Sequence, residues 1–173
     1  MRGRNYRDIK GHAYVRREFI PSIPRNKIVK FNMGTFSQDY NLKLELRAKE
    51  RAQIRHNALE AARIAANKKL SNIVGESYHF QIKVYPHVVL RENKMLAMAG
   101  ADRLQEGMRR AFGKPVGLAA RVEIDNVILE VNSKIEYLKD AKEALKVAAS
   151  KLPIPTYIKQ VLLKQSKKVV KES

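Results

Sequence analysis

The sequence predicts an α+β protein, an α/β sandwich in which two main helices pack on a mostly antiparallel sheet. Apolar and polar residues alternate in several short segments, for example at 42–46, which is the period of a half-buried strand. Two longer segments, at about 54–73 and 136–150, repeat apolar residues every three or four positions, as helices do. We expect residues 1–173 to form a single domain with a core at 28–152.

The first half of the core is expected to begin with two strands and a helix. Residues 28–31 predict a short strand that ends near Gly34, and residues 42–46 predict the next one. The helix at 54–73 then presents an apolar face to the sheet. This face consists of Leu59, Ala62, Ala66, Leu70 and Ile73.

The second half alternates strands with one more helix. Residues 80–84 predict a strand, and Pro86 interrupts it, so its continuation through 88–90 should be bent or at an edge. Two β-rich runs, 118–124 and 127–131, are separated only by Asp125-Asn126, which predicts a tight hairpin. The helix at 136–150 ends before two prolines. Residues 157–162 fit either a final strand or a helical turn.

The charge of the chain points to a polyanionic partner. Thirty-five Lys and Arg against 17 Asp and Glu give a net charge of +18. Residues 1–30 carry +7, residues 91–115 carry +3 and residues 151–173 carry +5, whereas residues 116–150 carry −1. A uniformly solvated, lysine-rich surface is the alternative, but it would not show this segregation. Clustered basic charge is the usual footprint of nucleic-acid binding.

Composition excludes several other classes. The chain has no cysteine, which removes disulfides, thiolate metal sites and cysteine nucleophiles. No apolar run approaches the ~18 residues that a membrane span needs. The first eight residues lack the apolar core of a signal peptide. We therefore expect a soluble, cytoplasmic protein with no membrane association.

Catalytic motifs are weak throughout. The four histidines, at 12, 56, 79 and 87, have none of the spacings of a metal site. Gly113-Lys114 fails as a phosphate loop, because five residues rather than four separate Gly107 from Gly113 and Pro115 follows the lysine. The acids Glu123, Asp125 and Glu130 alternate with apolar residues and are expected to face solvent. We expect no enzymatic activity, no metal and no cofactor.

The two basic segments are the candidate binding regions. Residues 1–27 mix arginines, aromatics and prolines, which favours an extended arm over the alternative of a disordered tail. A long loop at about 92–117 lies between two predicted strands and combines basic and apolar residues. Residues 153–173 form a basic tail. Charge spread over an arm, a loop and a tail suits a folded RNA better than the major groove of DNA.

Three sequence blocks carry a family resemblance. Residues 91–115 read RENKMLAMAGADRLQEGMRRAFGKP, residues 58–68 read ALEAARIAANK, and residues 79–86 read HFQIKVYP. The chain closely resembles the large-subunit ribosomal proteins known as L ten-e in archaea and eukaryotes and L sixteen in bacteria. The absence of the cysteines that are common in eukaryotic members suggests the archaeal type.

The resemblance implies a structural protein of the large ribosomal subunit that stays bound to the ribosome in the cytoplasm. Its implied partners are large-subunit rRNA, the tRNA acceptor arm near the peptidyl transferase centre, and neighbouring ribosomal proteins. In the arm, the implied RNA-binding residues are Arg2, Arg4, Tyr6, Arg7, Arg16, Arg17 and Arg25. Around the loop they are Arg91, Lys94, Arg103, Gln105, Arg109, Arg110 and Lys114. Gly100, Gly107 and Gly113 would allow the loop backbone to approach RNA closely.

Two other functions remain as alternatives from the sequence. An RNA-processing or modifying enzyme could use the basic loop as a lid, but it would need a convergent set of titratable groups that the sequence does not show. An architectural DNA-binding protein would bind duplex DNA as tightly as structured RNA.

Overall fold

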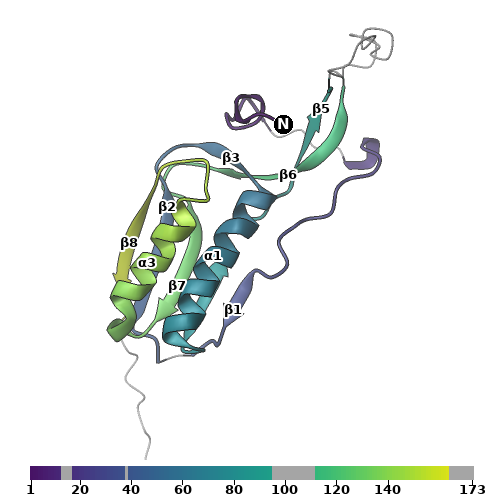
Figure 1. Cartoon of the computed structure of the whole chain (residues 1–173). Helices are drawn as coiled ribbons and strands as arrows, with labels where there is room; N and C mark the ends of the chain where they lie inside the picture. The colour runs from purple at the N-terminus through teal and green to yellow at the C-terminus, as the bar shows by residue number, and fades with distance from the viewer. Residues whose placement is uncertain (13–16, 38, 95–111, 164–173) are drawn as a thin grey trace, which may run out of the picture.

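A computed structural model describes residues 1–12, 17–37, 39–94 and 112–163. Its main layer is a five-stranded antiparallel sheet. Two helices, α1 (His56–Val74) and α3 (Leu138–Ala149), lie side by side on one face of this sheet (Figure 1). The predicted α+β fold with two helices on an antiparallel sheet is confirmed.

The five-stranded sheet has the order β1-β4-β7-β2-β8. The strands are β1 (Asn32–Gly34), β4 (Tyr78–Ile82), β7 (Val127–Ser133), β2 (Leu42–Ala48) and β8 (Thr156–Leu162). Residues 157–162 are thus a strand, one of the two conformations that the sequence allowed.

A second sheet extends from the first. It has three antiparallel strands in the order β3-β6-β5: β3 (Ala52–Arg55), β6 (Lys114–Val122) and β5 (Val88–Glu92). In Figure 1, β5 and β6 run beyond the ends of the helices, and the N-terminal segment lies near them. Three short 3-10 turns complete the described structure: η1 (Gly3–Asn5), η2 (Arg17–Phe19) and η4 (Ile135–Tyr137).

The core lies between the helices and the five-stranded sheet. Leu42, Leu44 and Leu46 of β2 are buried under the helices, and this is the alternation that the sequence showed. Both helices contribute fully buried alanines to the core, which permits close approach. These alanines are Ala62 and Ala66 of α1 and Ala141, Ala144 and Ala148 of α3.

Two details of the first half differ from the sequence-based prediction. The strand expected at 28–31 forms only at Asn32–Gly34, because side chains bind the earlier backbone: Asn26 accepts from Ile28 N–H and Glu60 from Val29 N–H. Ile73 is 43% exposed, and Val74 takes the buried position at the end of α1 instead.

The predicted hairpin across Asp125-Asn126 is wrong. The two runs belong to different sheets, since β6 pairs with β3 and β5 while β7 pairs with β2 and β4. The connecting turn binds the end of β2 instead: Asp125 N–H donates to the Ala48 carbonyl, and Ala48 N–H donates to the Asn126 carbonyl. Asp125 adopts φ +68°, so the chain changes direction there and crosses from one sheet to the other.

The bend predicted at Pro86 is confirmed, and here too the chain passes from one sheet to the other. Strand β4 ends at Ile82 in the five-stranded sheet, and β5 begins at Val88 in the three-stranded sheet. The loop predicted at about 92–117 is shorter, because Glu92 and Lys114 are paired residues of β5 and β6. The connection between these strands is therefore 93–113.

Candidate nucleic-acid interface

The N-terminal segment is anchored along the edge strand β3. The carbonyl of Arg7 accepts a hydrogen bond from Gln53 N–H at 2.8 Å, and the carbonyl of Tyr6 accepts one from the Gln53 side chain at 2.8 Å. The Arg55 guanidinium lies over the Tyr6 ring, 5.6 Å from its centroid. A cation–π contact of this kind is favourable. Backbone and side-chain contacts therefore hold the arm against β3.

The same segment also contacts the other two strands of this sheet. Arg121 of β6 donates to the carbonyl of Gly11. The amino group of Met1 lies 3.4 Å from a carboxylate oxygen of Glu92, the last residue of β5. These contacts hold residues 1–12 beside the strand ends from which the connection 93–113 departs.

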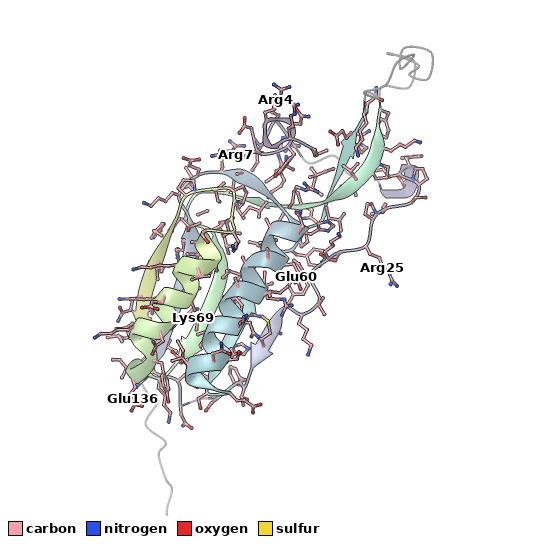
Figure 2. All side chains as sticks on the ribbon, in the orientation of Figure 1. Arg4, Arg7, Arg25, Glu60, Lys69 and Glu136 are labelled. Carbon is pink, nitrogen blue, oxygen red and sulfur yellow. The ribbon has the colours of Figure 1, made fainter. Side chains whose placement is uncertain are left out.

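Exposed cations gather on this end of the molecule. Arg2, Arg4 and Lys10 are exposed on the arm, and Lys94 and Lys114 are exposed where β5 and β6 end. Figure 2 shows Arg4 and Arg7 near the N-terminal turn, whereas Arg25 lies apart from them beside the beginning of α1. A surface on which cations outnumber acids raises the local concentration of an anionic partner.

Some of the predicted binding residues have partners within the chain. Arg7 pairs with Glu50 at 3.0 Å. Arg91 donates to the Phe112 carbonyl at 3.1 Å, and its guanidinium carbon lies 3.3 Å from the centroid of the Phe112 ring. Arg7 and Arg91 thus make structural contacts within the chain.

The backbone around Gly113 leaves no room for a side chain. Its φ is +77°, and a Cβ at this site would lie 2.8 Å from the backbone nitrogen of Asn93. A glycine is therefore required where the connection joins β6, because any side chain would collide with the opposite strand.

Several predicted residues fall outside the described residues. These are Arg16, Gly100, Arg103, Gln105, Gly107, Arg109 and Arg110. Arg17 begins η2, and its side chain is not described. The structure thus brings together Arg2, Arg4, Tyr6, Arg7, Arg91, Lys94, Gly113 and Lys114 from the predicted set.

A second charged cluster was missed in the sequence. Glu130 was expected to face solvent, but both it and Glu45 are only 6% exposed. Lys43 Nζ lies 3.1 Å from a carboxylate oxygen of each, and Lys83 Nζ lies 3.2 Å from Glu130. Arg47 donates to Glu45 at 2.6 Å. The alternation of charges at Lys43, Glu45 and Arg47 is the signal that could have located this cluster.

The electrostatics of this cluster favour the charged forms. Burial acts to raise the pKa of Glu130, but hydrogen bonds from Lys43, Asn132 and Lys83 outweigh it, and the net shift is downward. The pKa of Glu45 is likewise lowered, because its bonds to Arg47 and Lys43 outweigh its burial. For Lys43, burial acts to lower the pKa, but the two glutamates raise it overall.

The histidines show no catalytic arrangement. His56, the first residue of α1, is buried, and burial together with the charges of Arg55 and Lys27 lowers its pKa. Within the described ranges, no group of three or more His, Cys, Asp or Glu residues could hold a metal ion. Among the same residues, no helix has both the length and the apolar character needed to cross a membrane.

Comparisons with known proteins identify the family of this chain. The family described as ribosomal protein L16p/L10e matches residues 9–159. A protein of Staphylothermus marinus named large ribosomal subunit protein uL16 is 58% identical over 156 residues, which are 90% of each chain. The proteins of that name from Hyperthermus butylicus and Metallosphaera sedula are 55% and 52% identical. Those alignments cover 95% of this chain in both cases, and 92% and 96% of the relatives.

The matched region begins within the arm, at residue 9, and includes both helices, the connection 93–113 and every strand except the last three residues of β8. The resemblance seen in the three sequence blocks is thereby confirmed, and so is the expectation that the protein is no enzyme. The chain belongs to the ribosomal protein L16p/L10e family.

Proposed function

We propose that this protein is a structural component of the large ribosomal subunit that binds large-subunit rRNA through its N-terminal arm and its 93–113 connection. The main support for this proposal is the contact between these two basic segments. The Met1 amino group meets Glu92 at 3.4 Å, so the arm and the base of the loop form one surface. The exposed cations of that surface are Arg2, Arg4, Lys10, Lys94 and Lys114.

The mechanism is neutralisation of closely spaced phosphates by cations held on a folded support. Hydrogen bonds from Gln53 already hold part of the arm against β3. These arm residues therefore lose less conformational entropy on binding than a free tail would lose. If about eight phosphates are contacted, the logarithm of the binding constant should fall with the logarithm of salt concentration with a slope of roughly −6 to −7.

The finer role follows from the family resemblance. The connection 93–113 would extend toward the acceptor arm of tRNA near the peptidyl transferase centre, with Arg103, Gln105, Arg109 and Arg110 as its contacts. Neighbouring ribosomal proteins would be further partners, and the protein would remain ribosome-bound in the cytoplasm. Changing Arg103 and Arg109 together to Ala should weaken peptide synthesis by ribosomes without unfolding the protein.

Sedimentation tests the proposal. Tagged protein from a cell extract is run through a sucrose gradient, before and after a high-salt wash. Comigration with large subunits at one copy each, retained through moderate salt, is the expected result. A peak at the top of the gradient, with only heterogeneous RNA fragments attached, would contradict the proposal.

A variant pair assigns the binding to the arm. Changing Arg2 and Arg4 to Gln should lower retention on subunits during the salt wash, because two exposed arm cations are lost. The matched control changes Lys139 and Lys146, two exposed lysines of α3, to Gln and should leave retention unchanged. Equal loss in both variants would mean that net charge, rather than the arm, governs binding.

A further inference from the structure

The five-stranded sheet has a second face that the helices leave uncovered. Both α-helices of the described chain pack on the face that carries Leu42, Leu44 and Leu46 (Figure 1). Because side chains alternate along a strand, residues 43, 45 and 47 lie on the opposite face. The register adds their paired neighbours on β8, β7, β4 and β1. This open face consists of Asn32, Lys43, Glu45, Arg47, His79, Gln81, Lys83, Val127, Glu130, Asn132, Tyr157, Lys159 and Val161.

Buried carboxylates hold three cations of the open face, Lys43, Arg47 and Lys83, in place. Lys43 bridges Glu45 and Glu130, and Lys83 reaches Glu130. Arg47 donates to Glu45 from both Nε and Nη2, at 2.9 and 2.6 Å. Long cationic side chains normally lose rotamer freedom on binding a partner. Here much of that freedom is already lost in the free protein.

The surface that a partner would meet is positive. Four cations share the open face with Glu45 and Glu130, which are nearly buried, and the exposed Asp125 of the adjoining turn pairs with Arg47 at 2.7 Å, so the face keeps a net positive charge. Lys83 and Lys159 are exposed, and Lys43 keeps about a quarter of its side chain exposed. Apolar side chains are scarce among the paired residues, where they are Val127, Val161 and the ring of Tyr157. Protein–RNA contacts are rich in such cations and amides, whereas the centre of a protein–protein interface is depleted in charge.

An aromatic pair stands at one end of this face. Phe36 packs edge-on against the His79 ring, with 5.6 Å between ring centroids, and is itself 72% exposed. An exposed ring beside fixed cations and amides offers a stacking surface for a base or a ribose. The basic network and this ring together match the chemistry of a nucleotide chain.

We propose that the open face of the five-stranded sheet is a second RNA-binding surface, in which Lys43, Arg47, Lys83 and Lys159 contact the phosphates of one RNA strand. The inference rests on the proposed ribosomal function, but it concerns a face distinct from the arm and the 93–113 connection. Because Lys43, Arg47 and Lys83 are already held by carboxylates, they would bind phosphates at a smaller entropic cost than free side chains would.

Lysine labelling tests the proposal on the protein in its natural complex. An amine-acetylating reagent is applied to the free full-length protein and to intact large subunits that contain it, and mass spectrometry compares each lysine. We expect Lys83 and Lys159 to lose several-fold reactivity in the subunit. Lys10, Lys94 and Lys114 report on the arm and the loop in the same experiment.

The labelling pattern separates failure of the inference from failure of the proposed function. Protection of Lys10, Lys94 and Lys114 with full reactivity of Lys83 and Lys159 overturns the inference and leaves the function intact. Full reactivity at all five sites in material that does not sediment with subunits overturns both. Protection of Lys83 and Lys159 that survives digestion of the RNA would mean that a protein covers the face, which also overturns the inference.

A variant pair measures the contribution of the face to binding. Lys83→Gln with Lys159→Gln removes two exposed cations, and Lys139→Gln with Lys146→Gln removes two from the helical side. With large-subunit rRNA transcribed in vitro as the probe, the first pair should reduce the salt slope by about 1.8, since each lost phosphate contact contributes about 0.9. Equal slopes for both pairs and the unchanged protein would overturn the inference.

Discussion

Glu45 and Glu130 lie directly opposite each other on β2 and β7, and both are nearly buried. Two carboxylates in this position would repel each other if they were alone. Lys43 lies 3.1 Å from an oxygen of each and compensates the repulsion. The pair is thus the centre of an ion network that supports the sheet from its uncovered side.

Removing one charge of this network should destabilise the protein. Glu130→Gln leaves Lys83 without a charged partner and leaves Lys43 with Glu45 alone, and we expect a loss of about 2 kcal/mol in the free energy of unfolding, typical of hydrogen bonds to charged groups. Urea unfolding at neutral pH measures it. Glu136→Gln, at an exposed position, is the control and should change stability little. Equal stabilities of all three proteins would contradict a supporting role for the network.

The pH dependence of this effect has a definite sign. The pKa of Glu45 and of Glu130 is lower in the folded protein than the ordinary value of 4.5. Their stabilising contribution is therefore fully present above about pH 4.5 and is lost as the pH falls through the folded-state pKa. The stability difference between the protein and Glu130→Gln should shrink on acidification. A difference that grows at low pH would contradict the assignment.

Gly34 should tolerate no side chain. It has φ +78°, and a Cβ there would lie 2.0 Å from the Tyr78 carbonyl oxygen on the paired strand β4. Gly34→Ala should cost about 3 kcal/mol or more, because backbone strain and a collision add together. Gly75→Ala is matched in φ, at +66°, but has open space around the added Cβ, so only the backbone strain of about 1–3 kcal/mol is expected. Thermal unfolding of both variants compares the two costs.

The helix contact depends on small side chains. Ala62 of α1 is fully buried, whereas its neighbour Ala61 is exposed. Ala62→Leu should destabilise the protein by about 1–3 kcal/mol, because the close packing against the core cannot accept the added volume. Ala61→Leu should be nearly neutral. Equal denaturation midpoints for the two variants would show that the helices can separate without cost.

The attachment of the N-terminal arm to β3 should depend on the ring of Tyr6. Tyr6→Ala removes the contact with Arg55, worth about 0.5–1 kcal/mol. The Gln53 amide, which donates to Arg7, should then exchange with deuterium about two- to fivefold faster, the same free energy expressed as a ratio. Tyr6→Phe keeps the ring and should exchange at the original rate. Unchanged exchange in the alanine variant would show that the arm is held by its backbone contacts alone.

Local patterns in the sequence were sufficient for most elements. Period-two alternation located β2 and β4, and period-3.6 patterns located α1 and α3 within a few residues, because each pattern records which side of an element is buried. The net charge of +18 and its concentration in the arm, the loop and the tail indicated a nucleic-acid partner without any structure.

The division into two sheets was decided by tertiary contacts. Asp125-Asn126 satisfies the local rule for a hairpin, yet the turn binds Ala48 of β2 and sends β6 and β7 into different sheets. The four-residue strand β3 runs directly into α1 with no turn between them, so no local signal separated the two.

The sequence by itself determined both helices, most of the strands and their apolar faces, and it indicated the class of partner, since these depend on residue type and spacing along the chain. Only the tertiary structure decided that Glu130 is buried beside Glu45 and that Met1 meets Glu92. Such pairs join residues far apart in the chain, and their strength depends on burial and distance, which spacing in the sequence does not encode.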